Sequence, residues 1–346
     1  MKYHINNNGE VAVCHAQEGN CPLSGKHFNN PNEAQDYADE MNEYVYNSNL
    51  DESLARKEYI EIKLYREKLN SNKEYSLKEA LNRGLYVEEK VQLALKNKQD
   101  TYSLYYDKEL NDFTAERTAL HNKILKEILK KYENIPSEGK VIFSGGISGA
   151  GKTTILNSQL KINFDKYAIV SSDDFKEILA RENAIPKIEG LTPMEASTLV
   201  HKESSHLAER LLKNLAHKNK NIIYDFTCKD ENAAIKRIKT LNKFGYSNSK
   251  IQMVFVDVSL SISKERAKHR YREGLNNFKG YGGRWVPSHI QNNQKPISNK
   301  FNTKNSEAIV KLGTNEELNL PKPIIFDNTD IPTKIDFDDF KLGYKE

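Results

Sequence analysis

The sequence predicts an α/β protein with a mostly parallel sheet covered by helices on both faces, preceded by a helical N-terminal region. From Val141 onward, short apolar runs alternate with segments of helical periodicity, as in a buried parallel sheet. A glycine-rich turn follows the first of these runs. Before residue 107, apolar positions recur mainly at helical spacing. We therefore expect three parts: a Cys/His-containing segment over 1–30, a helical region over 31–106, and an α/β domain over 107–346.

Composition limits the classes of partner. A net charge of +4 over 346 residues gives little reason to expect nucleic acid as the main partner. No apolar run approaches the ~20 residues of a membrane span. The first residues lack the apolar core of a signal peptide, and three cysteines do not suggest a disulfide scaffold. We expect a cytoplasmic protein that has no membrane partner.

The first 30 residues contain a set of thiols and imidazoles, the ligands that Zn²⁺ prefers. The candidates are His4, Cys14, Cys21 and His27, although their spacing matches no standard zinc signature. A short hairpin with free cysteines is the alternative interpretation. Zinc content decides between the two.

The region 31–106 is predicted to be helical and contains no catalytic constellation. Asn30 and Pro31 begin the first helix, and a second runs from about Leu54 to Leu69. A third begins at Ser76, with Glu79 completing a capping box, and we expect it to stop at Gly84. Further helical spacing follows over 85–106.

The α/β domain begins with a long helix over 113–132. Ligands of such sheets bind beyond the carboxyl ends of the strands, so the residues just after each strand are the candidates for chemistry. The expected strands are Val141–Phe143, Tyr167–Val170, Asn221–Tyr224, Ile251–Val258 and Pro323–Phe326, and the expected helices are Lys152–Leu160, Phe175–Arg181, Pro193–His217 and Ile262–Arg272.

After the first strand, the chain fits the phosphate-loop pattern G-x-x-x-x-G-K-[ST] between a strand and a helix, which predicts a P-loop NTPase-type three-layer sandwich. The backbone N–H groups of such a loop and the helix N-terminus bind phosphates. Lys152 is predicted to reach the β- and γ-phosphates of ATP, and the Thr153 hydroxyl to ligate Mg²⁺. The predicted nucleotide-binding residues are Gly146, Ser148, Gly149, Ala150, Gly151, Lys152, Thr153 and Thr154.

Acidic residues follow the next two strands. Asp173 can accept a proton from a substrate hydroxyl or help to hold Mg²⁺, and it can also serve as a helix N-cap. Asp225 ends the third strand in the manner of a Walker B carboxylate, and Thr227 could face the substrate; a hydrogen-bonded turn is the alternative. Glu203 could bind a hydroxyl-bearing substrate, or lie on a solvated helix face.

Arginines follow the fourth strand. Arg270 precedes a glycine-rich loop and Arg284 lies within it, so the two could form a clamp on the transferred phosphoryl group. Arg272 is an alternative to Arg270. The other interpretation is a basic surface helix with Trp285 as an anchor.

Together these motifs resemble the zeta-toxin kinases over roughly residues 110–330. The resemblance rests on an ordered set of segments, of which the phosphate loop alone would be unspecific. They are Ala115–Leu125 (AERTALHNKIL), Gly145–Thr154 (GGISGAGKTT), Asp173–Lys176 (DDFK), His201–His206 (HKESSH), Ile222–Thr227 (IIYDFT), Gly283–Pro287 (GRWVP) and Phe326–Asn328 (FDN).

The resemblance implies roles for these residues. Lys152 corresponds to the phosphate-loop lysine, and Asp173 to the base that activates the acceptor hydroxyl. Glu203 and Thr227 look like sugar-binding residues, and Arg270 and Arg284 like the charge-stabilising pair. The implied reaction is Mg·ATP-dependent phosphorylation of UDP-N-acetylglucosamine, by which zeta toxins poison cell-wall synthesis.

Several alternatives remain. A related branch of effector proteins phosphorylates NAD on the adenosine ribose, and a polynucleotide kinase would use the same core with a basic, aromatic-lined groove. The alternative outside the enzymes is a non-catalytic interaction protein that is gated by nucleotide binding. The first ~110 residues lie outside the minimal toxin fold. We expect either a separate antitoxin partner or an N-terminal region that inhibits in cis or docks.

Overall fold

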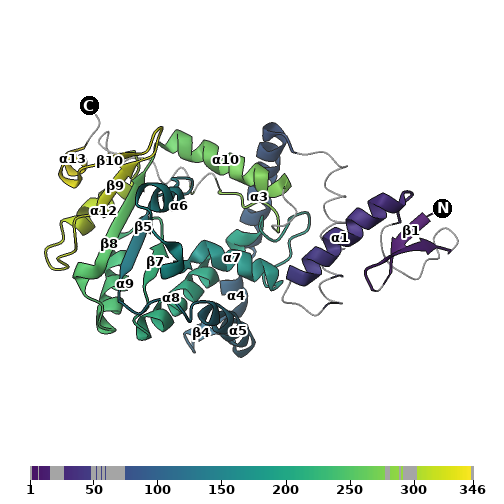
Figure 1. Ribbon diagram of the computed structural model, residues 1–346, viewed down its shortest axis with the longest axis horizontal. Helices are drawn as coiled ribbons and strands as arrows, with labels where there is room; N and C mark the ends of the chain where they lie inside the picture. Colours follow the sequence, from purple (N-terminus) through teal and green to yellow (C-terminus); the bar gives the residue numbers. More distant parts are fainter. Residues whose placement is uncertain are drawn as a thin grey trace. The chain divides into compact units, whose positions relative to one another are not determined.

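The computed structural model describes residues 2–6, 8–15, 27–47, 52, 56, 59, 75–276, 281–287, 290 and 302–343. The chain divides into two compact units, Met1–Glu74 and Tyr75–Glu346. Figure 1 shows the ribbon of both. None of the helices in the described ranges combines the length and apolar content needed to cross a membrane.

The first unit contains a small hairpin and a helix. β1 (Lys2–Ile5) pairs antiparallel with β2 (Val11–Cys14), and α1 spans Pro31–Asn47. The side chain of Asn30 accepts a hydrogen bond from the Asn32 amide at 2.8 Å, which explains why the helix begins here. The expected helix over Leu54–Leu69 lies almost entirely outside the described residues. Buried apolar residues of this unit are Phe28, Ala34, Tyr37, Ala38, Met41 and Tyr59.

The second unit is built around a six-stranded sheet, in the order β10-β9-β8-β5-β7-β6. Five strands are parallel and β10 is antiparallel to β9. β5 therefore lies between β7 and β8 (Figure 1). After β5 the chain forms β6 and β7 on one side of it, and then β8, β9 and β10 on the other side. The strands are β5 (Val141–Gly145), β6 (Ala168–Ser171), β7 (Ile222–Asp225), β8 (Ile251–Asp257), β9 (Ile324–Asp327) and β10 (Thr333–Ile335).

Helices precede and separate the strands. α3 (Leu77–Lys96), α4 (Thr101–Tyr105), the short hairpin β3 (Tyr106–Asp107) and β4 (Asp112–Phe113), and α5 (Ala115–Lys131) come before the sheet. The remaining helices are α6 (Lys152–Thr154) continued by a π-helix (Ile155–Gln159), α7 (Ser172–Arg181), α8 (His201–His217), α9 (Glu231–Lys243), α10 (Leu260–Asn276), α12 (Asn305–Gly313) and α13 (Phe337–Leu342). Short 3-10 turns cover Phe164–Lys166, Ser197–Val200 and Asn248–Lys250.

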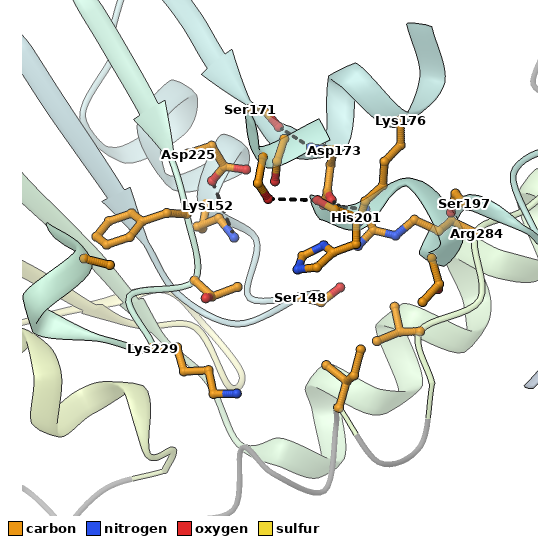
Figure 2. A pocket seen from close by; sticks show the side chains of 18 of the residues that line it. Ser148, Lys152, Ser171, Asp173, Lys176, Ser197, His201, Asp225, Lys229 and Arg284 are labelled. Carbon is orange, nitrogen blue, oxygen red and sulfur yellow. Dashed lines mark hydrogen bonds and ion pairs between the residues drawn. The ribbon is translucent and has the colours of Figure 1, made fainter. Parts of the chain in front are cut away.

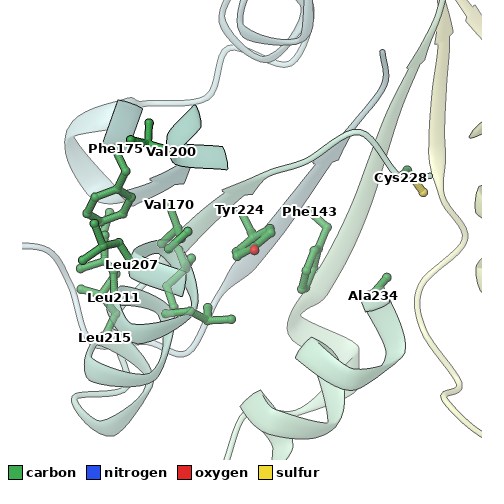
Figure 3. Packing of buried hydrophobic residues seen from close by; sticks show 14 of the residues in the cluster. Phe143, Val170, Phe175, Val200, Leu207, Leu211, Leu215, Tyr224, Cys228 and Ala234 are labelled. Carbon is green, nitrogen blue, oxygen red and sulfur yellow. The ribbon is translucent and has the colours of Figure 1, made fainter. Parts of the chain in front are cut away.

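Alternation along the strands makes both sheet faces apolar. Phe143 belongs to the cluster that includes Leu207 and Leu211 of α8, as Figure 3 shows. Its neighbour Ile142 faces the other way and packs with Leu156 of the π-helix. This is the three-layer α/β sandwich that the sequence predicts, because residues one apart in a strand point to opposite faces. Helices α9, α12 and α13 and strand β10 were not expected from the sequence.

The expected end of the third helix at Gly84 is wrong. The capping box at Ser76 and Glu79 is present, but α3 continues to Lys96. Gly84 lies inside the helix, where an added Cβ would stand 2.3 Å from the ring of Trp285. The glycine therefore allows a close contact rather than ending the helix.

Helix α3 belongs to the second unit. It packs against α10, and Val87, Val91 and Ala94 are buried in the main core cluster. The division of the chain falls at 74/75, whereas the sequence led us to place a boundary at 106/107. An amphipathic pattern shows that one face of a helix is buried, but not which core it joins.

Candidate active site

The phosphate loop connects β5 to α6 in a conformation that requires its glycines. Gly146 and Gly151 have φ angles of 141° and 84°. A Cβ on Gly151 would lie 2.4 Å from Nδ2 of Asn328, which donates a hydrogen bond to the Ala150 carbonyl at 2.7 Å. Asn328 follows β9, which lies two places from β5 in the sheet, so a segment next to a non-adjacent strand holds the loop in place.

Lys152 and Asp225 lie together at the carboxyl ends of β5 and β7. The ammonium of Lys152 donates to the Gly146 carbonyl at 2.9 Å and lies 3.5 Å from Oδ1 of Asp225. Burial raises the pKa of the Asp225 carboxyl, and the charge of Lys152 opposes that shift. The shielded Oδ1 has no hydrogen-bond partner among the described residues. The Asp225 carboxylate and the hydroxyl of the exposed Thr153 residue offer the oxygen ligands that Mg²⁺ prefers.

Asp173 stands at the start of α7, directly beyond β6. Ser171 is the N-cap of α7, and its side chain accepts from the Asp173 and Asp174 amides at 3.2 and 3.4 Å. Oδ1 of Asp173 lies 3.1 Å from Nζ of Lys176, and Oδ2 pairs with the guanidinium of Arg284. Burial alone would raise the pKa of this carboxyl, but the charges of Arg284 and Lys176 outweigh burial and hold the pKa well below its usual range.

The two predicted arginines reach the site from different segments. Arg284 pairs with Asp173, and Nη2 of Arg270 donates to the Ser148 hydroxyl of the phosphate loop at 2.9 Å. Within the described residues, Nε of the alternative Arg272 is shielded and has no hydrogen-bond partner. Of the two predicted candidates, Arg270 is therefore the one that contacts the phosphate loop.

Several of these residues line one cavity of about 370 Å³, whereas Arg270 and Thr153 do not line it. Figure 2 shows Lys152, Asp225, Asp173 and Arg284 around it. Members of the predicted set that line it are Ser148, Lys152, Asp173, Asp225, Thr227 and Arg284. The cavity thus brings residues predicted to bind ATP together with residues predicted to contact the phosphoryl acceptor.

Glu203 does not line this cavity. It is fully buried, and its carboxylate pairs with Arg117 at 2.6 and 2.9 Å and with Nε2 of His121 at 2.7 Å. Burial would raise the pKa of this carboxyl, but hydrogen bonds from His121 and Arg117 lower it. The structure places Glu203 in a buried ion-pair network between α5 and α8, outside the set of residues that line this cavity.

Four basic side chains that line the cavity were not predicted as site residues. Lys176 lies three residues after Asp173, and helical spacing could have identified it. His201 belongs to the quoted HKESSH segment, and burial together with Lys176 lowers its pKa to about 4. Lys229 and Arg237 also line the cavity. They lie just before α9 and on α9, a helix that the sequence did not lead us to expect, so no signal pointed to them.

The predicted Cys/His set of the first unit is partly assembled. Ligand atoms of His4, Cys14 and His27 all lie within 4.8 Å of one another. Cys21 lies outside the described residues.

Comparison with known families gives one match, the zeta toxin family model, over residues 125–311. That range is more than half of the 346-residue chain. The chain belongs to the zeta toxin family. Zeta toxins are kinases, so the enzyme is a phosphotransferase. The matched range includes the phosphate loop, Asp173 and Arg284.

Two solved structures resemble this zeta toxin family member at low identity. One is from the PezAT toxin–antitoxin system of Streptococcus pneumoniae: 18% identity, 65% of this chain and 81% of that chain covered, and a TM-score of 0.44. The other is the AvrRxo1-ORF1:-ORF2 complex with ATP: 17% identity, 65% and 67% covered, and a TM-score of 0.41. A search of curated protein sequences found no match.

Proposed function

We propose that this protein is a Mg·ATP-dependent kinase that phosphorylates a sugar hydroxyl of a nucleotide sugar such as UDP-N-acetylglucosamine, and that it acts as a toxin. The observation that supports this most directly is the shared cavity. Lys152 of the phosphate loop, the carboxylate of Asp173 and the guanidinium of Arg284 all line it. A kinase needs a phosphate-binding cation, a base and a charge-stabilising group in this arrangement.

In this proposal the phosphate loop binds the donor ATP. Its backbone amides and Lys152 hold the β- and γ-phosphates, and Arg270 steadies the loop through Ser148. Thr153 and Asp225 would hold Mg²⁺, which neutralises phosphate charge when bound.

Asp173 is proposed to accept the proton of the acceptor hydroxyl. Its two oxygens face Lys176 and Arg284, so it is held ionised and is a weak base while both pairs persist. The proposal therefore requires the Arg284 guanidinium to leave Asp173 and pair with the phosphoryl group that is being transferred. Asp173 then becomes a stronger base at the moment when the hydroxyl loses its proton.

Three of the remaining lining residues favour a small anionic acceptor. Lys229, Arg237 and His201 line the same cavity as Asp173. The diphosphate of a nucleotide sugar would meet these nitrogen groups, and a volume of about 370 Å³ is in the range for small-molecule sites. Family membership also supports restraint of the toxin by an antitoxin protein, and inhibition in cis by the N-terminal region is the alternative that we propose to test.

The test is acceptor identification. Purified protein is incubated with Mg²⁺ and γ-labelled ATP, with UDP-N-acetylglucosamine, NAD or a 5′-hydroxyl RNA oligonucleotide as acceptor. We expect label and one added phosphoryl group on UDP-N-acetylglucosamine, and none when Lys152→Ala replaces the wild type. Transfer to NAD alone would show that the acceptor is NAD and not a nucleotide sugar. Transfer to RNA alone would show that the enzyme is a polynucleotide kinase. Equal transfer by Lys152→Ala and wild type would refute the proposal.

A further inference from the structure

The hairpin at the start of the chain places two metal-ligating side chains on one face. In the β1–β2 register, His4 is opposite Ala12 and Lys2 is opposite Cys14. His4 and Cys14 are therefore diagonal neighbours, two positions apart across the pair. Diagonal neighbours point to the same side of the sheet because side chains alternate with a period of two.

A third extended segment brings a second imidazole to the same face. Tyr3 exchanges two backbone hydrogen bonds of 2.8 Å with Phe28, in an antiparallel bridge on the other side of β1. Antiparallel pairing then sets His27 opposite His4. The two imidazole rings lie with their centroids 5.7 Å apart, edge to face.

The three side chains converge on a common point. Their ligand atoms lie within 4.8 Å of one another, and each residue is half-buried. Nε2 of His27 is shielded from solvent and has no hydrogen-bond partner among the described residues. A shielded nitrogen without a partner is costly unless something binds it. Cys14 is a free thiol.

The two strands of the hairpin bury little apolar surface. None of the residues of β1 and β2 is fully buried, and a two-stranded hairpin alone is marginally stable. The apolar core of this unit, in its described part, is small. Small units of this kind are commonly stabilised by a disulfide or a metal ion.

We propose that His4, Cys14 and His27 bind a zinc ion that fixes the N-terminal hairpin. Two imidazole nitrogens and one thiolate are a typical zinc donor set. Tetrahedral zinc needs such atoms about 3.3–3.6 Å apart. Side-chain rotations that move the ligand atoms by about 1 Å would complete the site. On binding, the Cys14 thiol releases its proton to solvent and its sulfur becomes a thiolate ligand. The fourth coordination position is not assigned to any residue of the described set.

The experiment measures zinc in the untagged full chain, because a histidine tag would itself bind metal. We expect about one zinc per chain by elemental analysis, and a tetrahedral thiolate spectrum after cobalt substitution. The variants Cys14→Ser and His27→Gln should each lower zinc content at least fivefold. The controls His15→Gln, next to the site, and Cys228→Ser, in the second unit, should retain it.

Folding is monitored in the same variants by the melting transition of the second unit. Alkylation of wild-type Cys14 provides an independent readout, since zinc should slow it at least tenfold and a chelator should restore it. A wild-type chain without zinc and with unprotected Cys14, or full zinc content in Cys14→Ser, would overturn the proposal.

Discussion

The carboxylate of Asp173 has a cation at each oxygen. Lys176 lies 3.1 Å from Oδ1, and Arg284 pairs with Oδ2. Lys176 is itself buried, and burial together with the charge of Arg284 lowers its pKa. The site therefore carries its acid–base group in the ionised form across the neutral range. In the proposed mechanism, the step that controls reactivity is then the departure of Arg284 from Asp173, not loss of a proton from Asp173.

A titration of His201 gives a prediction at the residue level. Burial and the charge of Lys176 lower its pKa to about 4, with Asp173, Arg284 and Lys202 also nearby. An unfolded His titrates near 6.5. The folded state therefore prefers the neutral ring, and this contribution to stability is complete above about pH 6.5 and is lost as pH falls toward 4. We expect His201→Gln to reduce the drop in melting temperature between pH 7 and 5.

The effect should be modest, because His201 is partly exposed and water screens its neighbours. Thermal melts at pH 7, 6 and 5 measure it, with Ser205→Ala as the control for lost packing in the cavity. Equal drops in wild type and His201→Gln would contradict the assigned shift.

At the level of elements, the pair α5 and α8 depends on Glu203. Removing one partner of a buried ion pair typically costs 3–5 kcal/mol, because the remaining charge is left unpaired. We expect Glu203→Gln to lower the free energy of unfolding by about 3 kcal/mol at pH 7. Because the folded pKa of Glu203 is lowered, its contribution exists above the unfolded value and fades as the solution becomes acidic.

Urea unfolding measures that loss. The matched control is Glu182→Gln, whose partner Lys123 also belongs to α5 but is about half exposed, so we expect a loss below about 1 kcal/mol. The acceptor KM of folded Glu203→Gln should stay within about twofold, an expectation that follows from its position outside the cavity. A tenfold rise in KM with unchanged stability would return Glu203 to the substrate site.

The contact between α3 and Trp285 gives a second element-level prediction. Trp285 packs over Gly84 and donates to Glu88 at 3.2 Å, and it is adjacent to Arg284. Gly84→Ala should gain up to about 1 kcal/mol of helix propensity. Because the added methyl group would overlap the ring, we expect a net loss of about 1–3 kcal/mol and a lower kcat. A more stable and fully active Gly84→Ala enzyme would show that the contact is not needed.

Sequence patterns predicted those parts of the site that depend on local chemistry. The glycines and Lys152 of the phosphate loop, and Asp173 and Asp225 after their strands, are local features and lie where they were expected. The role of Glu203 could not be read, because an acidic residue on a helix face has the same spacing whether it meets substrate or Arg117. The helix end predicted at Gly84 was wrong for the same reason. Only the tertiary contact with Trp285 distinguishes a glycine that allows close packing from one that ends a helix.

For the whole molecule, the described cavity residues all belong to the second unit. We expect a chain of residues 75–346 to remain folded and to phosphorylate its acceptor at least as fast as the full chain. A chain of residues 106–346 should be unstable, since it lacks Val87, Val91 and Ala94 of the main core. Melting temperatures and turnover of the two truncations check this.

An inactive or insoluble 75–346 chain would show that the first unit contributes to the catalytic fold. Faster turnover than the full chain, with greater toxicity on expression, would support inhibition in cis. Removal of all residues before 106 would not separate relief of inhibition from loss of α3.

The most direct test of the account is the initial rate of phosphoryl transfer from Mg·ATP to UDP-N-acetylglucosamine in two adjacent variants. Asp173→Asn removes the proposed base, and we expect kcat to fall by about 10²- to 10⁴-fold. Asp174→Asn changes the neighbouring carboxylate, which does not line the cavity, and we expect a rate within about threefold of wild type. Equal rates in wild type and Asp173→Asn would contradict the central claim that Asp173 is the base of a kinase.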